Sequence, residues 1–190
     1  IHLVQADLYR LPFRAQVFDG IYSIGVLHHL PDPEAAFGQL VRFAKPGAAI
    51  AIWVYSAQRR GINACLEAVR RVTTRLPMGV LYGLSWMAAL IDWCGWIAPY
   101  RLLQRWPLTR AWIERAAWPR VKLYAKYPFE VCVADWFDRL SAPVRFYYSP
   151  EQLRQWCDRQ ALTDVQITPT GLYGLRAYGR RPHAAHPVAS

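Results

Sequence analysis

Two adjacent histidines, His28 and His29, stand where an apolar stretch ends, and imidazoles are the side chains best suited to proton transfer near neutral pH. Residues 18–27 before them carry no charge after Asp19, as expected of a strand buried on both faces. One ring can accept a proton from a nucleophilic hydroxyl, while the other can bond loop backbone. The sequence leaves open which of the two histidines accepts the proton.

Asp7 is a second candidate, because it follows a short, partly β-branched segment, residues 1–6, that is expected to be a strand. A carboxylate at the carboxyl end of a strand can accept hydrogen bonds from an amino group of a ligand at that edge of an α/β sheet. The alternative is a carboxylate that caps its own loop.

The elements around these residues predict a parallel crossover. Asp32 can cap a helix, Pro33 suits its first position and Glu34 complements its dipole, so a helix is expected over residues 33–44. Residues 48–55 form an uninterrupted apolar run, which predicts another buried strand. A strand, a helix and a strand in this order indicate an α/β sheet.

The pattern changes over residues 59–126, where twelve basic residues face three acidic ones and supply nine of the ten excess positive charges. Six of the nine tryptophans lie there. An amphipathic helix is expected over residues 62–76, and residues 79–98 have Asp92 as their only charge. Prolines divide the remainder into short basic helices.

The sheet pattern returns near the C-terminus. Residues 144–148 can form a strand, Ser149 and Gln152 fit a capping box with Pro150 at the first helical position, and residues 165–177 alternate as a closing hairpin.

Three linked segments, QADLYRLPF, FDGIYSIGVLHHLPDP and VRFAKPGAAIAI, resemble class I S-adenosylmethionine-dependent methyltransferases of the small-molecule, ubiquinone-biosynthesis-like branch. The match is tight over residues 3–55 and looser over 149–179, and Ala48 replaces the second glycine of the family's PGG turn. The resemblance implies a Rossmann-like α/β fold, S-adenosylmethionine as the cofactor, and methyl transfer to a small, lipophilic acceptor. The O, N or C identity of the acceptor atom stays open.

Residue by residue, the resemblance places Asp7 on the adenine amine, the Leu8 backbone N–H on an adenine ring nitrogen, and Ser23 and Gly25 beneath the methionine part. His28 or His29 would be catalytic. The residues expected to line the acceptor pocket are Asp135, Trp136, Phe137, Tyr147 and Tyr148. Each also has a purely structural interpretation. Asp7 can cap its own loop, Ser23 and Gly25 can pack within a strand, and the aromatic residues can belong to the core.

The family's glycine-rich loop and ribose-binding acidic residue are not found in this sequence. We therefore expect it to begin at the family's third strand, without the first two, and to be inactive as it stands. The predicted organisation is a partial cofactor-binding core over 1–58, a helical lid over 59–128 inserted between strands five and six, the rest of the core over 129–181, and a disordered tail over 182–190.

The alternative function is a non-catalytic basic module that binds a membrane or nucleic acid through residues 59–126. Nucleic acid is disfavoured because no recognition motif is present, and a nicotinamide-dependent oxidoreductase lacks its glycine fingerprint. Four scattered cysteines and the histidine spacing predict neither disulfides nor a metal site, and favour the cytoplasm. Peripheral membrane contact is expected through residues 59–126, and a transmembrane span is not.

Overall fold

The computed structural model describes residues 1–170 and 173–183, and these divide into two compact units. The sheet unit comprises residues 1–59 and the chain from Val144 onward, and the helical unit comprises Arg60–Pro143. The sheet unit therefore resumes at Val144 and not at residue 129, because the helix α7 (Phe129–Ser141) packs with the helical unit. The expected tail lies largely outside the described residues.

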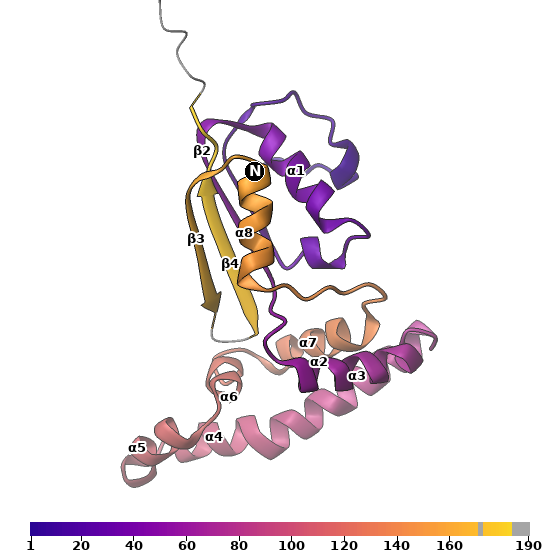
Figure 1. Ribbon diagram of the computed structural model, residues 1–190. Coiled ribbons are helices and arrows are strands. Elements are labelled where there is room, and N and C mark those ends of the chain that lie inside the picture. The colour runs from indigo at the N-terminus through magenta and orange to yellow at the C-terminus, as the bar shows by residue number, and fades with distance from the viewer. Residues whose placement is uncertain (171–172, 184–190) are drawn as a thin grey trace, which may run out of the picture. The chain divides into compact units, whose positions relative to one another are not determined.

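The sheet unit is built on four strands in the order β1-β2-β4-β3 (Figure 1). β1 (Phe18–Ile24) and β2 (Ala44–Tyr55) are parallel, and α1 (Pro33–Phe43) connects them. β3 (Thr163–Thr170) and β4 (Gly174–Arg180) form an antiparallel hairpin, and β4 pairs antiparallel with β2. This arrangement confirms the predicted α/β class and the crossover.

The core of the sheet unit lies where α1 and α8 (Pro150–Arg159) pack on one face of the sheet (Figure 1). Alternate residues of β2 point into it, as the two-residue period of a strand requires. Ser149 caps α8 through the predicted capping box. The fully buried side chains include Phe37, Ile52, Leu153 and Leu175.

Two predicted strands are wrong. Residues 1–6 form no strand and are exposed, because no described strand lies beside them to share backbone hydrogen bonds. Residues 144–148 make only one isolated bridge, Ser56 to Tyr148, although Tyr148 N–H also donates to the carbonyl of Tyr55 at 2.9 Å. Propensity alone does not make a strand without a partner along its length.

The helical unit runs along one long helical stretch that consists of α3 (Met78–Asp92), a π-helical turn η3 (Trp93–Ile97) and α4 (Ala98–Leu103) (Figure 1). α2 (Arg60–Thr73), α5 (Pro107–Ala116), α6 (Pro119–Tyr124) and α7 complete the unit. Prolines occupy the first helical positions of α5 and α6, where their missing N–H costs nothing.

Candidate functional site

The candidate site lies at the carboxyl ends of β1 and β2, the edge at which open α/β sheets bind ligands. After β1 the chain turns through Gly25, whose φ of +76° is a conformation that side chains with a Cβ rarely adopt. The Gly25 N–H donates to the carbonyl of Trp53 at 3.1 Å. A short 3-10 turn, η2 (Leu27–His29), then presents both histidines at this edge.

His28 is fully buried, and its ring lies 4.2 Å from the ring centroids of both Tyr55 and His29. Neither ring nitrogen has a hydrogen-bond partner among the described residues. Burial, reinforced by His29 and Arg145, lowers the pKa of His28 to about 3. His28 is therefore neutral at physiological pH and a weak base.

His29 is half-buried, and its Nδ1 lies 2.9 Å from the carbonyl oxygen of Val144. A carbonyl can only accept, so Nδ1 carries the proton and donates it. The neutral ring then has its lone pair on Nε2, which is the arrangement that a proton acceptor needs. The two histidines thus differ in burial and in hydrogen bonding. The sequence alone did not distinguish them in this way.

Aromatic side chains complete this cluster, which we call the histidine-aromatic cluster: His28, His29, Trp53, Tyr55 and Tyr147. The Tyr55 ring lies 6.1 Å from that of Tyr147, and the Trp53 indole N–H donates to Thr170 Oγ1 at 2.8 Å. Sequence reasoning missed Trp53 and Tyr55. Their place at the end of the apolar run 48–55 was the available signal, because it puts them at the same sheet edge as the histidines.

A cation also faces the cluster. The Arg145 guanidinium lies 4.5 Å from the centroid of the Tyr55 ring. Such a contact orients both groups and keeps positive charge next to the buried imidazole. The Phe146 N–H donates to the carbonyl of His28 at 2.9 Å, which fixes this segment against the histidine turn.

Asp7 and Leu8 lie at the 3-10 turn η1 (Leu8–Arg10), where Asp7 Oδ1 accepts from the Tyr9 N–H at 2.9 Å. The Asp7 side chain is exposed. The Tyr9 hydroxyl donates to the Asp32 carbonyl at 2.9 Å and accepts from its N–H at 3.0 Å. This tie holds the turn to the start of α1, so Asp7 and the histidine segment reach the same side of the sheet unit.

Ser23 is buried within β1, one residue before the strand's end, and Gly25 has no atom within 4 Å of the position a Cβ would take. The backbone there is consequently open to close approach. The assigned roles of Asp7, Leu8, Ser23 and Gly25 in cofactor binding stay predictions.

The five residues predicted to line one acceptor pocket do not come together within one unit. Tyr147 and Tyr148 belong to the sheet unit, where Tyr148 is buried 4.7 Å from the ring of Trp156 and burial raises its pKa to about 12. The other three lie on α7 in the helical unit.

Asp135 and Trp136 belong to an internal charged network. Arg120 pairs with Asp92 and, at 2.9 Å, with Asp135, which also accepts from Arg139 at 2.8 Å. The Trp136 indole N–H donates to Asp92 at 3.2 Å. Burial disfavours the ionised form of Asp135, but the two arginines outweigh it and lower the pKa of its carboxyl group. These side chains hold α3, α6 and α7 together.

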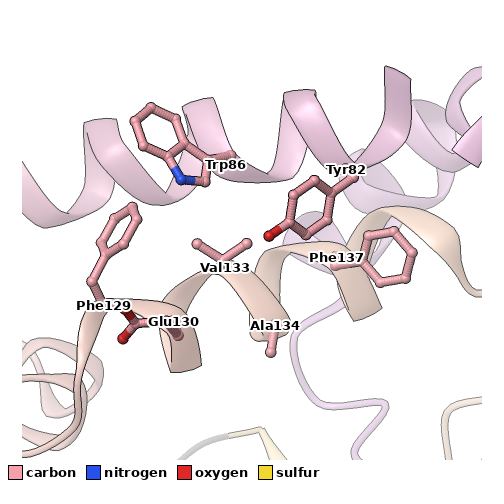
Figure 2. A pocket seen from close by; sticks show the side chains of 7 residues that line it. All are labelled: Tyr82, Trp86, Phe129, Glu130, Val133, Ala134 and Phe137. Carbon is pink, nitrogen blue, oxygen red and sulfur yellow. The ribbon is translucent and has the colours of Figure 1, made fainter. Parts of the chain in front are cut away.

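Phe137, by contrast, lines an open pocket of about 420 Å³ between α3 and α7 (Figure 2). The residues around it are Tyr82, Trp86, Phe129, Glu130, Val133, Ala134 and Phe137. Figure 2 shows Tyr82 and Trp86 on one helix facing Phe129 and Val133 on the other. Glu130 is its only charged residue, so the pocket suits an apolar guest.

The family match covers the N-terminal part of the chain. Residues 1–52 match the family model described as a methyltransferase domain. Cycloartenol-C-24-methyltransferase 1 of Oryza sativa subsp. japonica is 36% identical over 50 residues, 26% of this chain and 14% of that protein. A tRNA (carboxymethyluridine(34)-5-O)-methyltransferase of Arabidopsis thaliana is 33% identical over 85 residues, 43% of this chain and 19% of the relative.

An uncharacterised protein of Synechococcus is similar over a longer stretch, 29% identical over 170 residues, which is 86% of this chain and 35% of that protein. Among solved structures, a S-adenosylmethionine-dependent methyltransferase of Thermotoga maritima, a possible histamine N-methyltransferase, aligns with a TM-score of 0.46 at 10% identity, over 95% of this chain and 64% of that one. The chain spans between 14% and 35% of the length of these three curated relatives. Residues 1–52 of this chain are thus similar to the methyltransferase domain family, as are the parts of the chain that match the two named methyltransferases.

Proposed function

We propose that this chain takes part in methyl transfer from S-adenosylmethionine to a small, lipophilic acceptor. The observation that carries the proposal is the sheet edge at which Asp7, the open backbone at Gly25 and the histidine pair lie, within the segment that matches the methyltransferase domain. The exposed Asp7 carboxylate can accept from the adenine amine, and the open backbone near Gly25 admits the methionine part. S-Adenosylmethionine supplies an activated methyl group.

His29 is the proposed general base, since its Nδ1 donates to Val144 and its lone pair is therefore on Nε2. The buried His28, with its pKa of about 3, supports the turn instead. In a protein completed at its N-terminus with the family's glycine-rich loop, His29→Gln should lower turnover while donor affinity holds. His28→Gln should lower turnover less than His29→Gln does.

The lipophilic acceptor is supported by the pocket of Figure 2, which offers aromatic and aliphatic walls and one carboxylate. Ala134→Phe would fill part of it and should raise KM for an apolar acceptor more than it lowers kcat, because it removes binding space. An unchanged KM would contradict this location of the acceptor.

Donor binding is tested by titration calorimetry with S-adenosylmethionine. In a protein completed at its N-terminus with the family's glycine-rich loop, Asp7→Ala should weaken binding by about 1–3 kcal/mol, the usual cost of losing one charged hydrogen-bond partner. Asp19→Ala is the matched control, because Asp19 is an exposed carboxylate at the start of β1 that pairs with Lys45. If the two variants bind the donor alike, the assignment of Asp7 to the adenine amine is wrong.

A further inference from the structure

The helical stretch α3–η3–α4 buries one stripe of side chains and exposes a second stripe that is also apolar. The buried stripe comprises Leu81, Ser85, Ala89 and Ile97. The opposite face exposes between 38% and 69% of the side chains of Val80, Leu84, Met87 and Ile91. Asp92, the only charged residue from Met78 to Tyr100, turns inward to Arg120. The exposed stripe therefore offers water no charged group at all.

Four tryptophans of the helical unit are also exposed. Trp96, Trp106, Trp112 and Trp118 expose between 54% and 65% of their surface. An indole has a large apolar body and a single N–H donor, which suits the boundary between lipid headgroups and acyl chains. Four such side chains in one unit of a water-soluble domain would be costly if they faced water alone.

Basic residues accompany the tryptophans along α4 and α5. Arg101, Arg105 and Arg115 are exposed, and within the described parts of the chain no carboxylate pairs with Arg105 or Arg115. The segment between Arg59 and Lys126 carries nine excess positive charges. This charge is complementary to a surface of anionic lipids.

We propose that the helical unit docks on the surface of an anionic membrane, with the Val80–Leu84–Met87–Ile91 stripe and the exposed tryptophans in the interface. An amphipathic helix binds such a surface by burying its apolar face at the headgroup boundary while its cations meet the lipid phosphates. This inference goes beyond the proposed methyl transfer, because it needs neither donor nor acceptor.

The helix lies on the membrane and does not cross it. Met78–Leu103 is long and apolar enough to span, and only 22% of its most apolar window is buried. However, both ends of the helical unit return to the sheet unit, where Tyr148 N–H bonds to the carbonyl of Tyr55. A single crossing would put these bonded residues on opposite sides, and the described residues hold no second span for a return.

The experiment is flotation of the full chain with vesicles of phosphatidylcholine alone and of phosphatidylcholine with phosphatidylglycerol, at low and high salt. We expect binding to the anionic vesicles only, weakened by salt. Vesicles with brominated acyl chains should quench tryptophan fluorescence, because the exposed indoles reach the acyl boundary. Binding that survives alkaline carbonate would overturn the interfacial placement in favour of insertion.

Two matched pairs of variants separate the apolar and the charge contributions. Met87→Gln/Ile91→Gln should lower vesicle binding at least about tenfold, because it removes two apolar side chains from the membrane interface. Its control is Tyr22→Gln/Ile24→Gln, which removes exposed apolar side chains from β1. Arg105→Gln/Arg115→Gln should lower binding by roughly fivefold for each charge removed, and Arg10→Gln/Arg14→Gln is its control.

Circular dichroism shows whether each variant keeps its helices, and the brominated-lipid readout on the unaltered chain does not depend on any variant. Absence of binding to anionic vesicles overturns the proposal. A second outcome would also overturn the proposal. If the unaltered chain binds no vesicles but its mass increases with concentration, and Met87→Gln/Ile91→Gln abolishes this increase, the stripe is an interface between two copies. Equal losses in the variants and their controls would also overturn it.

Discussion

The two units of this chain differ in where their ion pairs lie, exposed in the sheet unit and largely buried around Arg120 in the helical unit. The sheet unit encloses an apolar core of side chains such as Phe37, Leu153 and Leu175 and keeps its charges at the surface. The helical unit encloses the Arg120 network and exposes Trp112, 65% of which faces outward.

The difference has a physical meaning. Burying ionised groups costs desolvation that their mutual attraction barely repays, so such a network serves geometry more than net stability. Exposing indoles to water forgoes apolar burial. A unit that both buries ion pairs and exposes indoles is suited to contact with an apolar neighbour. The helix-covered face of the sheet unit is instead suited to contact with water.

The largest expected effect concerns the charged network. Arg120→Met should destabilise the helical unit by about 3–5 kcal/mol, because it leaves Asp92 buried without its cation and leaves Asp135 with Arg139 alone. Urea denaturation followed by tryptophan fluorescence measures the loss. Arg110→Met, which removes an exposed pair with Glu114, should cost less than about 1 kcal/mol. Equal costs would mean that the network is effectively solvated and that the contrast between the units is overstated.

The apolar side of the contrast is tested by two truncations to alanine. Leu153→Ala removes a fully buried side chain of the sheet unit and should cost about 2–5 kcal/mol. Met87→Ala, on the exposed stripe of α3, should change the free energy of unfolding by no more than about 0.5 kcal/mol in the absence of lipid. A large loss at Met87 would show that this face is already covered within the chain.

His28 provides an acid-sensitive feature of the sheet unit. Its pKa falls from 6.5 to about 3 in the folded state because of burial, so below pH 6.5 the unfolded chain binds a proton that the native chain refuses. The stabilising contribution is complete above pH 6.5 and is lost as the pH falls toward 3, by at most about 1.4 kcal/mol per pH unit. Denaturation at several pH values should show a shallower acid loss in His28→Leu. An identical slope in the two proteins would contradict the buried, neutral state.

The smallest effect is expected at a helix end. Ser149 Oγ accepts from the Gln152 N–H at 3.3 Å, and Gln152 Oε1 accepts from the Ser149 N–H at 2.8 Å. Ser149→Ala should therefore cost about 1 kcal/mol of stability. Helix α3 begins at Met78, and Pro77 at its N-cap position makes no side-chain capping hydrogen bond. The stability of α3 must therefore come from packing. Pro77→Ala should cost less stability than Ser149→Ala, and a larger cost would reverse this ranking.

Local signals were sufficient for much of the sheet unit. The Asp32–Pro33 start of α1 and the Ser149 cap of α8 depend on hydrogen bonds within a few residues, and each is confirmed. The strand expected over residues 1–6 is wrong for the opposite reason, because a strand needs a partner that its own residues do not specify. The same holds for residues 144–148, which have a parallel neighbour only at Ser56.

The candidate site was predictable to a similar extent. The sequence by itself determined that the histidine pair follows an apolar strand of an α/β sheet, since hydrophobic period and chain order are local properties. Only the tertiary structure decided that His28 is buried without a partner while His29 donates to Val144, a carbonyl far along the chain. It likewise paired Asp135 with Arg120, turned Trp136 toward Asp92 and left Phe137 beside a pocket. Burial and partner choice depend on which distant side chains meet, and no local pattern carries that information.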